Sequence, residues 1–423
     1  MVLGVKVWCL VFAAVVGQRG SVAGSPLVSE AALQQAGFNK IWEAKVPLVA
    51  GDTIRDAYLV DEALYVVTTF GSIFSLKADV GLLRWGAKLT EADYRIYPPA
   101  HLREGDGAGP VVVPTTTAVF IYDRYSGDLK YRFKPEFVIG SAAVGIGNNL
   151  FMGGADGRFY SLRLDRRYPE RPIKRWDVLA GGPVTATPVL YDRDSLLFAS
   201  QSGKIFACLA GDKTLRWSFR TQGAINGGPT VDDSGVYVAS TDRSLYKLHR
   251  GIGTVLWRAR FPRPLTEGPT VAAQTVFQFC PGKGLAALDA MTGNEKWRME
   301  DGLSLAAHSP NGDVVFSTSN LLRVVHHETG EVLATVEVPS VLKAVSNVQD
   351  GSVYLLGRDG RVVCTRLDDS PYLRRQQVMA AKQQLNQPPV DESKAREQLP
   401  KPFVPQPDPN EDDPLRSKKD TKP

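Results

Sequence analysis

Cysteine and histidine are scarce in this sequence, which has four cysteines and five histidines among 423 residues. No Cys-x-x-Cys pair occurs, and no pair of histidines has the spacing of metal ligands. The one adjacent pair, His326-His327, would point to opposite faces of a strand and would not chelate one ion. The sequence therefore predicts no metal site.

An excess of one charge sign is also absent. The formal net charge is +5, but Lys6 and Arg19 lie within the first 23 residues. The segment from Ser370 onward contributes +2, with ten Lys or Arg against eight Asp or Glu. The part between these ends is therefore close to +1, which argues against a nucleic-acid-binding surface.

Long apolar runs are missing beyond the amino terminus, so no later segment is predicted to cross a membrane. Residues 1–23 contain one early lysine, an apolar stretch from Val7 to Val16 and the small residues Ser21-Val-Ala23. This pattern predicts a cleavable signal peptide, cut after Ala23, and hence a periplasmic or secreted protein. A membrane anchor or a buried N-terminal segment is the alternative. Cys9 lies inside the apolar stretch without a Leu-x-Gly/Ala context before it, so lipoprotein anchoring is not predicted.

What the sequence does contain is a repeated phrase that ends in tryptophan. Trp217, Trp257 and Trp297 are each 40 residues apart, and Trp176 lies 41 residues before Trp217. A period of this length is typical of repeat architectures. Within one unit, residues 229–261, short alternating segments are separated by turns rich in Gly and Asp. This pattern predicts four antiparallel strands per unit and no helix.

Four-stranded sheets bury both faces by stacking radially, which predicts an all-β fold, a β-propeller, over residues 38–368. Fourth strands are expected at eight positions: Trp42, Trp85, Tyr131, Trp176, Trp217, Trp257, Trp297 and near Ala334. The last unit lacks a fourth strand, and the first Trp strand, Lys40–Val46, lacks companions. The N-terminal strand should therefore close an eighth blade and remove the open edge. Seven blades is the alternative if the unit near Ala334 is miscounted.

After the propeller the composition changes. Residues 370–423 are rich in Pro and mixed charge, which predicts a disordered tail with one short helix over Arg374–Leu385. The tail is either an inert spacer or a proline-rich peptide that docks elsewhere.

The cysteines of the mature chain are predicted to be buried free thiols. Cys208 and Cys364 occupy matching third-strand positions four units apart, so they should lie across the propeller, too far apart for a disulfide. Cys280 has no partner in a metal-binding pattern.

The phrase from Ala287 to Trp297, Ala-Leu-Asp-Ala-Met-Thr-Gly-Asn-Glu-Lys-Trp, resembles the tryptophan-docking repeat of pyrroloquinoline-quinone (PQQ)-like β-propellers. The resemblance covers roughly residues 38–368. Each Trp is expected to pack on the turn of the neighbouring unit. The expected docking residues are Trp42, Trp85, Trp176, Trp217, Trp257, Trp297, Gly81, Gly127, Gly253, Gly293 and Gly330.

This family has a catalytic branch of quinoprotein dehydrogenases and a non-catalytic branch typified by the outer-membrane assembly factor BamB. The chain has no Cys-Cys pair and little room for insertions, and its size and secretory start are similar to the BamB-like branch. The loops comparable to the partner-binding loops of BamB, Asp177–Gly182 and Phe219–Asn226, do not carry the acidic pattern of that branch. The resemblance therefore implies the fold, but not a specific partner.

The sequence favours a monomeric scaffold that binds another protein, in the manner of BamB in outer-membrane protein assembly, with no turnover and no cofactor. A PQQ-dependent dehydrogenase, which would hold PQQ and calcium, is the first alternative. A propeller that binds carbohydrate or another polymer is the second.

Two predicted insertions are the candidate contact surfaces, because Arg and Tyr are favoured at interaction hot spots and long loops often carry function. The first is Arg95–Gly107 and the second is Arg166–Pro172. The candidate contacts are Arg95, Tyr97, Arg103, Arg166, Arg167 and Tyr168. The alternative is that both segments are ordinary solvated loops.

Overall fold

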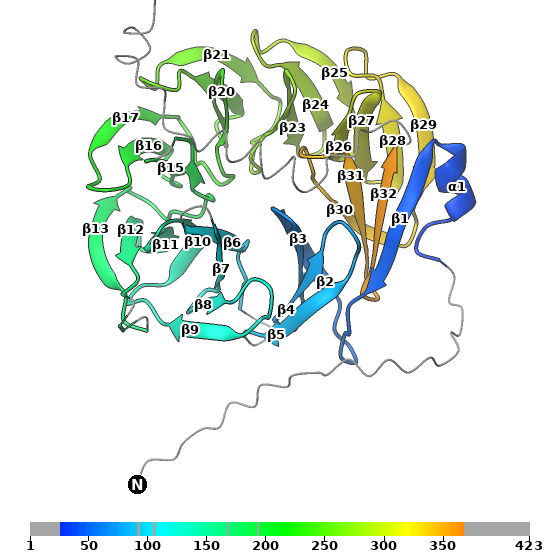
Figure 1. Cartoon of the computed structure of the whole chain (residues 1–423). Helices are drawn as coiled ribbons and strands as arrows, with labels where there is room; N and C mark the ends of the chain where they lie inside the picture. Colours follow the sequence, from blue (N-terminus) through cyan, green and yellow to red (C-terminus); the bar gives the residue numbers. More distant parts are fainter. Residues whose placement is uncertain are drawn as a thin grey trace, which may run out of the picture. The chain divides into compact units, whose positions relative to one another are not determined.

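Eight four-stranded antiparallel sheets surround a common axis in the computed structural model of the chain (Figure 1). The structure describes residues 26–90, 94–104, 107–165, 167–168, 170–192 and 194–367. The predicted signal peptide, 1–23, and the predicted tail, 370–423, lie outside these described residues. Within them, no helix is long and apolar enough to cross a membrane.

The sheets follow one another along the chain as blades 1 to 8. Blades 1 to 4 are β2 (Ile54–Val60), β3 (Ala63–Thr68), β4 (Ser72–Lys77), β5 (Leu83–Lys88); β6 (Ala100–Glu104), β7 (Gly107–Pro114), β8 (Val119–Tyr122), β9 (Leu129–Phe133); β10 (Ile139–Ile146), β11 (Asn149–Gly154), β12 (Arg158–Arg163), β13 (Ile173–Leu179); and β14 (Val189–Leu190), β15 (Ser195–Ala199), β16 (Lys204–Leu209), β17 (Leu215–Arg220). Blades 5 to 8 are β18 (Thr230–Asp232), β19 (Gly235–Ser240), β20 (Ser244–Leu248), β21 (Val255–Arg260); β22 (Thr270–Ala272), β23 (Thr275–Cys280), β24 (Gly284–Asp289), β25 (Glu295–Met299); β26 (Gly302–Ser309), β27 (Gly312–Ser317), β28 (Leu321–Val325), β29 (Val332–Glu337); and β30 (Val341–Val345), β31 (Ser352–Gly357), β32 (Arg361–Leu367), β1 (Phe38–Lys45). The prediction of eight blades is confirmed, and seven is wrong because β26 to β29 form a complete sheet.

Blade 5 shows how the sequence pattern produces a blade. Its second and third strands, β19 and β20, are buried along their whole length, because neighbouring blades cover both faces. Its fourth strand, β21, contains exposed positions because it lies at the rim. First strands of neighbouring blades contact one another, as β18 and β22 do, which places them at the axis. The four antiparallel strands predicted over residues 229–261 are therefore confirmed.

The N-terminal strand closes the ring as predicted. β1 pairs antiparallel with β32, and Trp42 lies opposite Cys364. The sheet order of blade 8 is β30-β31-β32-β1, so the strand that comes first in the sequence is its outermost strand (Figure 1). Closure of this kind pairs the outer edge of β32, which would otherwise be open.

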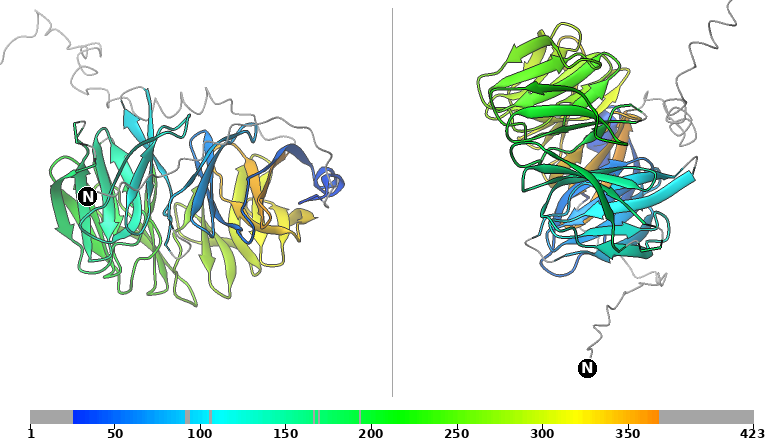
Figure 2. Two further views of the ribbon diagram at one scale, coloured as in Figure 1. Left: turned by 90° about the horizontal axis from the view of Figure 1, so that it is seen from below. Right: turned by 90° about the vertical axis from the view of Figure 1, so that its left-hand side faces the viewer.

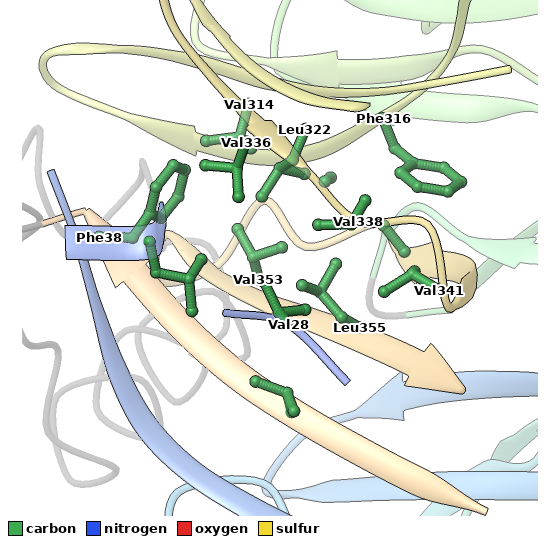
Figure 3. Close-up of a cluster of buried hydrophobic side chains, with 14 of the residues drawn as sticks. Val28, Phe38, Val314, Phe316, Leu322, Val336, Val338, Val341, Val353 and Leu355 are labelled. Atoms are coloured by element: carbon green, nitrogen blue, oxygen red, sulfur yellow. The ribbon is translucent and has the colours of Figure 1, made fainter. Parts of the chain in front are cut away.

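A short helix that the sequence analysis did not predict lies at this closure. α1 (Glu30–Gln35) begins after Ser29, whose hydroxyl accepts a hydrogen bond from the backbone of Ala32 at 3.4 Å. Leu33 of this helix is fully buried, in the cluster that fills the space between blades 7 and 8. Figure 3 shows Phe38 of β1 and Val28 in the same cluster.

The segment Arg95–Gly107 is not an insertion between blades, which corrects the prediction. It includes the first strand of blade 2, β6, which pairs with β7 so that Glu104 lies opposite Gly107. The Pro-Pro pair before β6 and the Gly residues after it obscured a short strand in the sequence. Blade 2 therefore has a complete set of four strands.

The described cysteines are free and buried, as predicted. Cys208 lies on β16 of blade 4 and Cys364 on β32 of blade 8, so four blades separate them around the ring. Burial raises the pKa of each of these two thiols to about 12. Both thiols therefore stay protonated at neutral pH and are poor nucleophiles.

Candidate functional site

The alternating strands give the ring two distinct faces, and the strands run between them (Figure 2). We call one the docking-turn face: it carries the turns between first and second strands and between third and fourth strands. The opposite one is the crossover face, which carries the turns between second and third strands and the connections between blades.

Six of the eight blades carry a tryptophan on the fourth strand, and each indole N–H donates to a backbone carbonyl of the next blade. The distances from Nε1 to oxygen are 3.0 Å for Trp42 to Ala78, 3.0 Å for Trp85 to Arg124, 3.3 Å for Trp176 to Ala210, 2.9 Å for Trp217 to Arg250, 3.1 Å for Trp257 to Ala290 and 2.8 Å for Trp297 to His327. These contacts join consecutive blades at the docking-turn face.

Five of these indole rings pack closely against a glycine of the accepting turn. The pairs are Trp42 with Gly81, Trp85 with Gly127, Trp217 with Gly253, Trp257 with Gly293 and Trp297 with Gly330. At Gly253 the backbone φ is +70°, and an added Cβ would lie 2.4 Å from Cε3 of Trp217. Only glycine allows both this left-handed conformation and such close contact.

The accepting turn of Trp176 departs from this pattern. Its left-handed position is occupied by Lys213, with φ +61°, and not by glycine. The indole of Trp176 makes the longest of the six hydrogen bonds, at 3.3 Å. The Cβ of Lys213 thus takes space that the glycine leaves free in the other turns.

Replacing Lys213 with glycine should stabilise the protein. A side chain in the left-handed region costs roughly 1–2 kcal/mol, and glycine removes this cost. We expect Lys213→Gly to raise the free energy of unfolding by about 1 kcal/mol, measured by thermal and urea denaturation. The reciprocal change in the next blade, Gly253→Lys, should lower it. A lower melting temperature for Lys213→Gly would contradict this explanation.

Two blades have no tryptophan on the fourth strand. In blade 2 the position is Tyr131, which packs against the cluster that contains Leu162 and Leu164 of blade 3. In blade 7 it is Ala334, which packs against the cluster that contains Leu33. Blade 8 offers Ala334 no docking turn, because β32 and β1 are joined only by pairing and not by a loop. Helix α1 contacts β29 instead.

The candidate contacts of the first segment are divided between the surface and the core. Arg95 is exposed on the crossover face, where its backbone carbonyl accepts a hydrogen bond from Thr116. Tyr97 is only 8 % exposed, and its hydroxyl donates to the carbonyl of Ile139 at 2.8 Å. Tyr97 is thus a core residue of blades 2 and 3, and its side chain is not available to a partner. Arg103 lies on β6, opposite Ala108.

The second segment is the longest of the turns between third and fourth strands. It connects β12 and β13 in blade 3, on the docking-turn face, so it lies on the opposite face from Arg95. Arg167 is exposed and Tyr168 is 60 % exposed. Arg166 lies outside the described residues. Arg103, beside the turn from β6 to β7, lies on the docking-turn face as the second segment does, so the first segment spans both faces.

Sequence reasoning missed a buried polar cluster where blades 1 and 2 meet. Glu62 in the turn after β2 lies 3.6 Å from a guanidinium nitrogen of Arg84 and 3.6 Å from one of Arg124. All three side chains are less than a tenth exposed. The carbonyl of Arg124 accepts the indole hydrogen bond of Trp85. The cluster therefore supports a docking turn, and no periodic sequence signal links its members.

Beside this cluster, His101 bridges two side chains of blade 1. Its Nδ1 lies 2.8 Å from Asp61 Oδ2, and its Nε2 lies 2.7 Å from the hydroxyl of Tyr65. Burial lowers the pKa of His101 below its usual value despite the carboxylate. In the neutral ring, Nδ1 donates to Asp61 and Nε2 accepts from Tyr65. Tyr65 is fully buried, so this chain of hydrogen bonds presents no reactive group to a substrate.

The prediction that His326 and His327 lie on a strand is wrong. These residues do not lie on a strand; they occupy the turn that follows β28. The rule that adjacent strand residues point to opposite faces therefore does not apply to His326 and His327. Instead, His327 lies near His308 and Asp313 of the same blade. The positions of these three residues, 308, 313 and 327, do not follow the spacing of a metal-binding motif, so the sequence did not reveal the cluster.

These contacts define a closed eight-bladed β-propeller in which tryptophans of one blade dock on turns of the next. The family model described as "Outer membrane protein assembly factor BamB" matches residues 167–300 and 217–340, which together are less than half of the chain. The repeat over these residues is therefore similar to that of PQQ-like β-propellers.

Solved structures with similar folds include the crystal structure of BamB from Moraxella catarrhalis. It has a TM-score of 0.63 and 16 % identity, with coverage of 79 % of this chain and 99 % of that chain. The computationally designed Ika8 protein has a TM-score of 0.58 and 15 % identity, with coverage of 77 % and 98 %. At these identities the likeness concerns the fold. No curated protein matches the sequence.

Proposed function

We propose that this chain is a non-catalytic propeller of the cell envelope that binds another protein and takes part in outer-membrane protein assembly. The observation that supports this proposal most is the match of residues 167–340 to the family model described as an outer membrane protein assembly factor. The fold supports it as well, since the BamB structure is covered over nearly its whole length. We further propose that residues 1–23 direct the chain to this compartment and are removed.

The two alternative functions have less support from the described residues. A quinone-dependent dehydrogenase would need calcium ligands and carboxylates at the axis. The first strands β14 and β22 supply Val-Leu and Thr-Val-Ala there, and the carboxylate of Asp56 on β2 is paired with Lys343 of β30. A polymer-binding propeller would need aromatic side chains gathered at one mouth, whereas most described aromatics lie between blades.

The partner surface that we propose is the loop of blade 3 on the docking-turn face. Tyr168 is 60 % exposed there, and Arg167 beside it is also exposed. An exposed Tyr and Arg on a rigid scaffold have the chemistry of an interaction hot spot. The segment at Arg95 offers less, because Tyr97 is buried and the Arg95 side chain stacks on its ring at 5.2 Å.

A crosslinking pull-down from envelope extracts tests this proposal. We expect the mature chain to recover an outer-membrane protein, and Tyr168→Ala with Arg167→Glu to weaken recovery at least about tenfold, as for hot-spot residues. Arg95→Ala is the matched control, because it removes an exposed arginine from the opposite face. Recovery of no outer-membrane protein would refute the assembly role. Equal loss with Arg95→Ala would refute the choice of face.

A further inference from the structure

Three side chains from separate segments of blade 7 meet at its docking-turn face. Pairing of β26 with β27 places His308 opposite Asp313, and the turn after β28 brings His327 beside them. Nδ1 of His308 lies 2.7 Å from Oδ1 of Asp313, and Nδ1 of His327 lies 3.1 Å from Oδ2. The two imidazole rings are 4.9 Å apart between centroids. One donor atom from each residue lies within 4.8 Å of the others.

The hydrogen bonds of His327 leave a mismatch at this cluster. Its Nε2 lies 3.2 Å from the carbonyl oxygen of Pro310, which only accepts, so Nε2 carries the proton. In a neutral ring Nδ1 then has a lone pair, and it faces Oδ2 of Asp313. Both atoms are buried and neither has a hydrogen-bond partner. Asp313 is 1 % exposed, so water does not separate the two acceptors.

A cation between these two atoms removes the mismatch. We propose that His308, Asp313 and His327 bind one divalent first-row transition-metal ion, with Zn²⁺ as the best match. The site does not depend on the proposed partner or on the proposed function of the chain. It uses no residue of the blade 3 loop.

The distances and donor types fit this class of ion. Tetrahedral zinc lies about 2.0–2.2 Å from imidazole nitrogen and carboxylate oxygen, which sets the two ligand atoms about 3.3–3.6 Å apart. The observed 3.1 Å between His327 Nδ1 and Asp313 Oδ2 is a few tenths of an ångström shorter, so a small outward shift of the two side chains would admit the ion. Two imidazoles with one carboxylate favour zinc, nickel or copper over magnesium or calcium, which prefer all-oxygen sites.

The surroundings of the three ligands also suit a metal. A metal-bound histidine usually donates its other N–H to a carbonyl or carboxylate, as Nε2 of His327 does to Pro310. The side chains of His308 and His327 are 27 % and 28 % exposed, so water can reach the open coordination positions. The carbonyl of His327 accepts the indole hydrogen bond of Trp297 at 2.8 Å. A bound ion would therefore also hold the docking turn between blades 6 and 7.

The polar cluster at His101 shows why similar residues elsewhere do not make a second site. Asp61, Glu62 and His101 also place donor atoms close together. Both ring nitrogens of His101, however, already have partners, Asp61 and Tyr65. Glu62 faces two guanidinium groups, so its charge is already balanced. At His101, therefore, no imidazole lone pair faces a carboxylate oxygen, as it does between His327 and Asp313.

Metal titration of the tag-free mature chain tests the proposal. After treatment with a chelator and its removal, Zn²⁺ is titrated by isothermal calorimetry, and Co²⁺ is followed by its visible absorption. We expect one ion per chain and a higher melting temperature with zinc, and no comparable response to Mg²⁺ or Ca²⁺. Asp313→Asn and His327→Gln should weaken zinc binding more than about 10–100-fold, the usual loss for a mere supporting contact.

Two further variants keep the test decisive. His308→Gln changes a partly exposed ligand and should weaken binding even if Asp313→Asn fails to fold. His249→Ala removes an exposed histidine from the corresponding turn of blade 5 and should bind zinc as the wild type does. Wild-type protein that takes up no zinc would overturn the proposal, and so would equal loss in His249→Ala. Nitrogen NMR could also show that both ring nitrogens of His327 are protonated in a protein that takes up no zinc. A proton between His327 and Asp313, and not a metal ion, would then resolve the mismatch.

Discussion

A chain that lacks residues 26–45 is expected to lose the closed ring and to aggregate instead of forming a folded monomer. This deletion removes α1 and β1, so β32 loses its partner from Leu367 to Arg361. It also removes Leu33 and Phe38, which are fully buried between blades 7 and 8. Figure 3 shows Phe38 in this cluster. Each such side chain contributes about 1.5–3 kcal/mol, and a folded protein has only about 5–15 kcal/mol in total.

Size-exclusion chromatography and thermal melting by circular dichroism measure this loss. A synthetic peptide of residues 26–46, added in trans, should restore the monomer peak and the melting transition, because it supplies the missing strand and helix. The same peptide with Leu33→Asp and Phe38→Asp is the control, since it keeps the backbone donors and acceptors but not the apolar contacts. A truncated chain that stays monomeric and melts like the full chain would contradict the role of the closure.

The blade count could be predicted because the repeat is visible in the sequence. Trp217, Trp257 and Trp297 mark equivalent positions, and strand alternation around them fixes the phase of each unit. The missing fourth strand of the last unit, together with the unpaired strand at Trp42, predicted the closure. These are local patterns, and radial stacking follows from them because one sheet cannot bury two faces alone.

The remaining features depend on contacts that the repeat does not encode. Tyr97 looks like an exposed loop residue in the sequence, but it packs across a blade boundary and bonds to Ile139. Helix α1 exists where the repeat is interrupted, because the closure has no docking turn to receive a tryptophan. The cluster of His308, Asp313 and His327 joins a hairpin to a turn, so its spacing follows the geometry of blade 7 and not a motif.

The second large effect is expected at the docking contact between blades 4 and 5. Trp217 is 6 % exposed, packs in the cluster between these blades and donates to the carbonyl of Arg250 at 2.9 Å. Trp217→Ala removes these contacts and leaves a cavity, so we expect a loss of about 3–5 kcal/mol in the free energy of unfolding. Urea denaturation monitored by circular dichroism measures it. Ile252→Ala, at a 62 % exposed position of the accepting turn, should have little effect.

A double-mutant cycle with Gly253 separates steric docking from backbone strain. Gly253→Ala should cost about 1–2 kcal/mol for the left-handed backbone, plus the clash of its Cβ with Trp217. Gly147→Ala is the matched control, because its φ is +56° but nothing lies within 4 Å of the added Cβ. In the Trp217→Ala background the clash is absent, so Gly253→Ala should cost no more than Gly147→Ala. Additive losses for Trp217→Ala and Gly253→Ala would show that the indole ring does not rest on the glycine in solution.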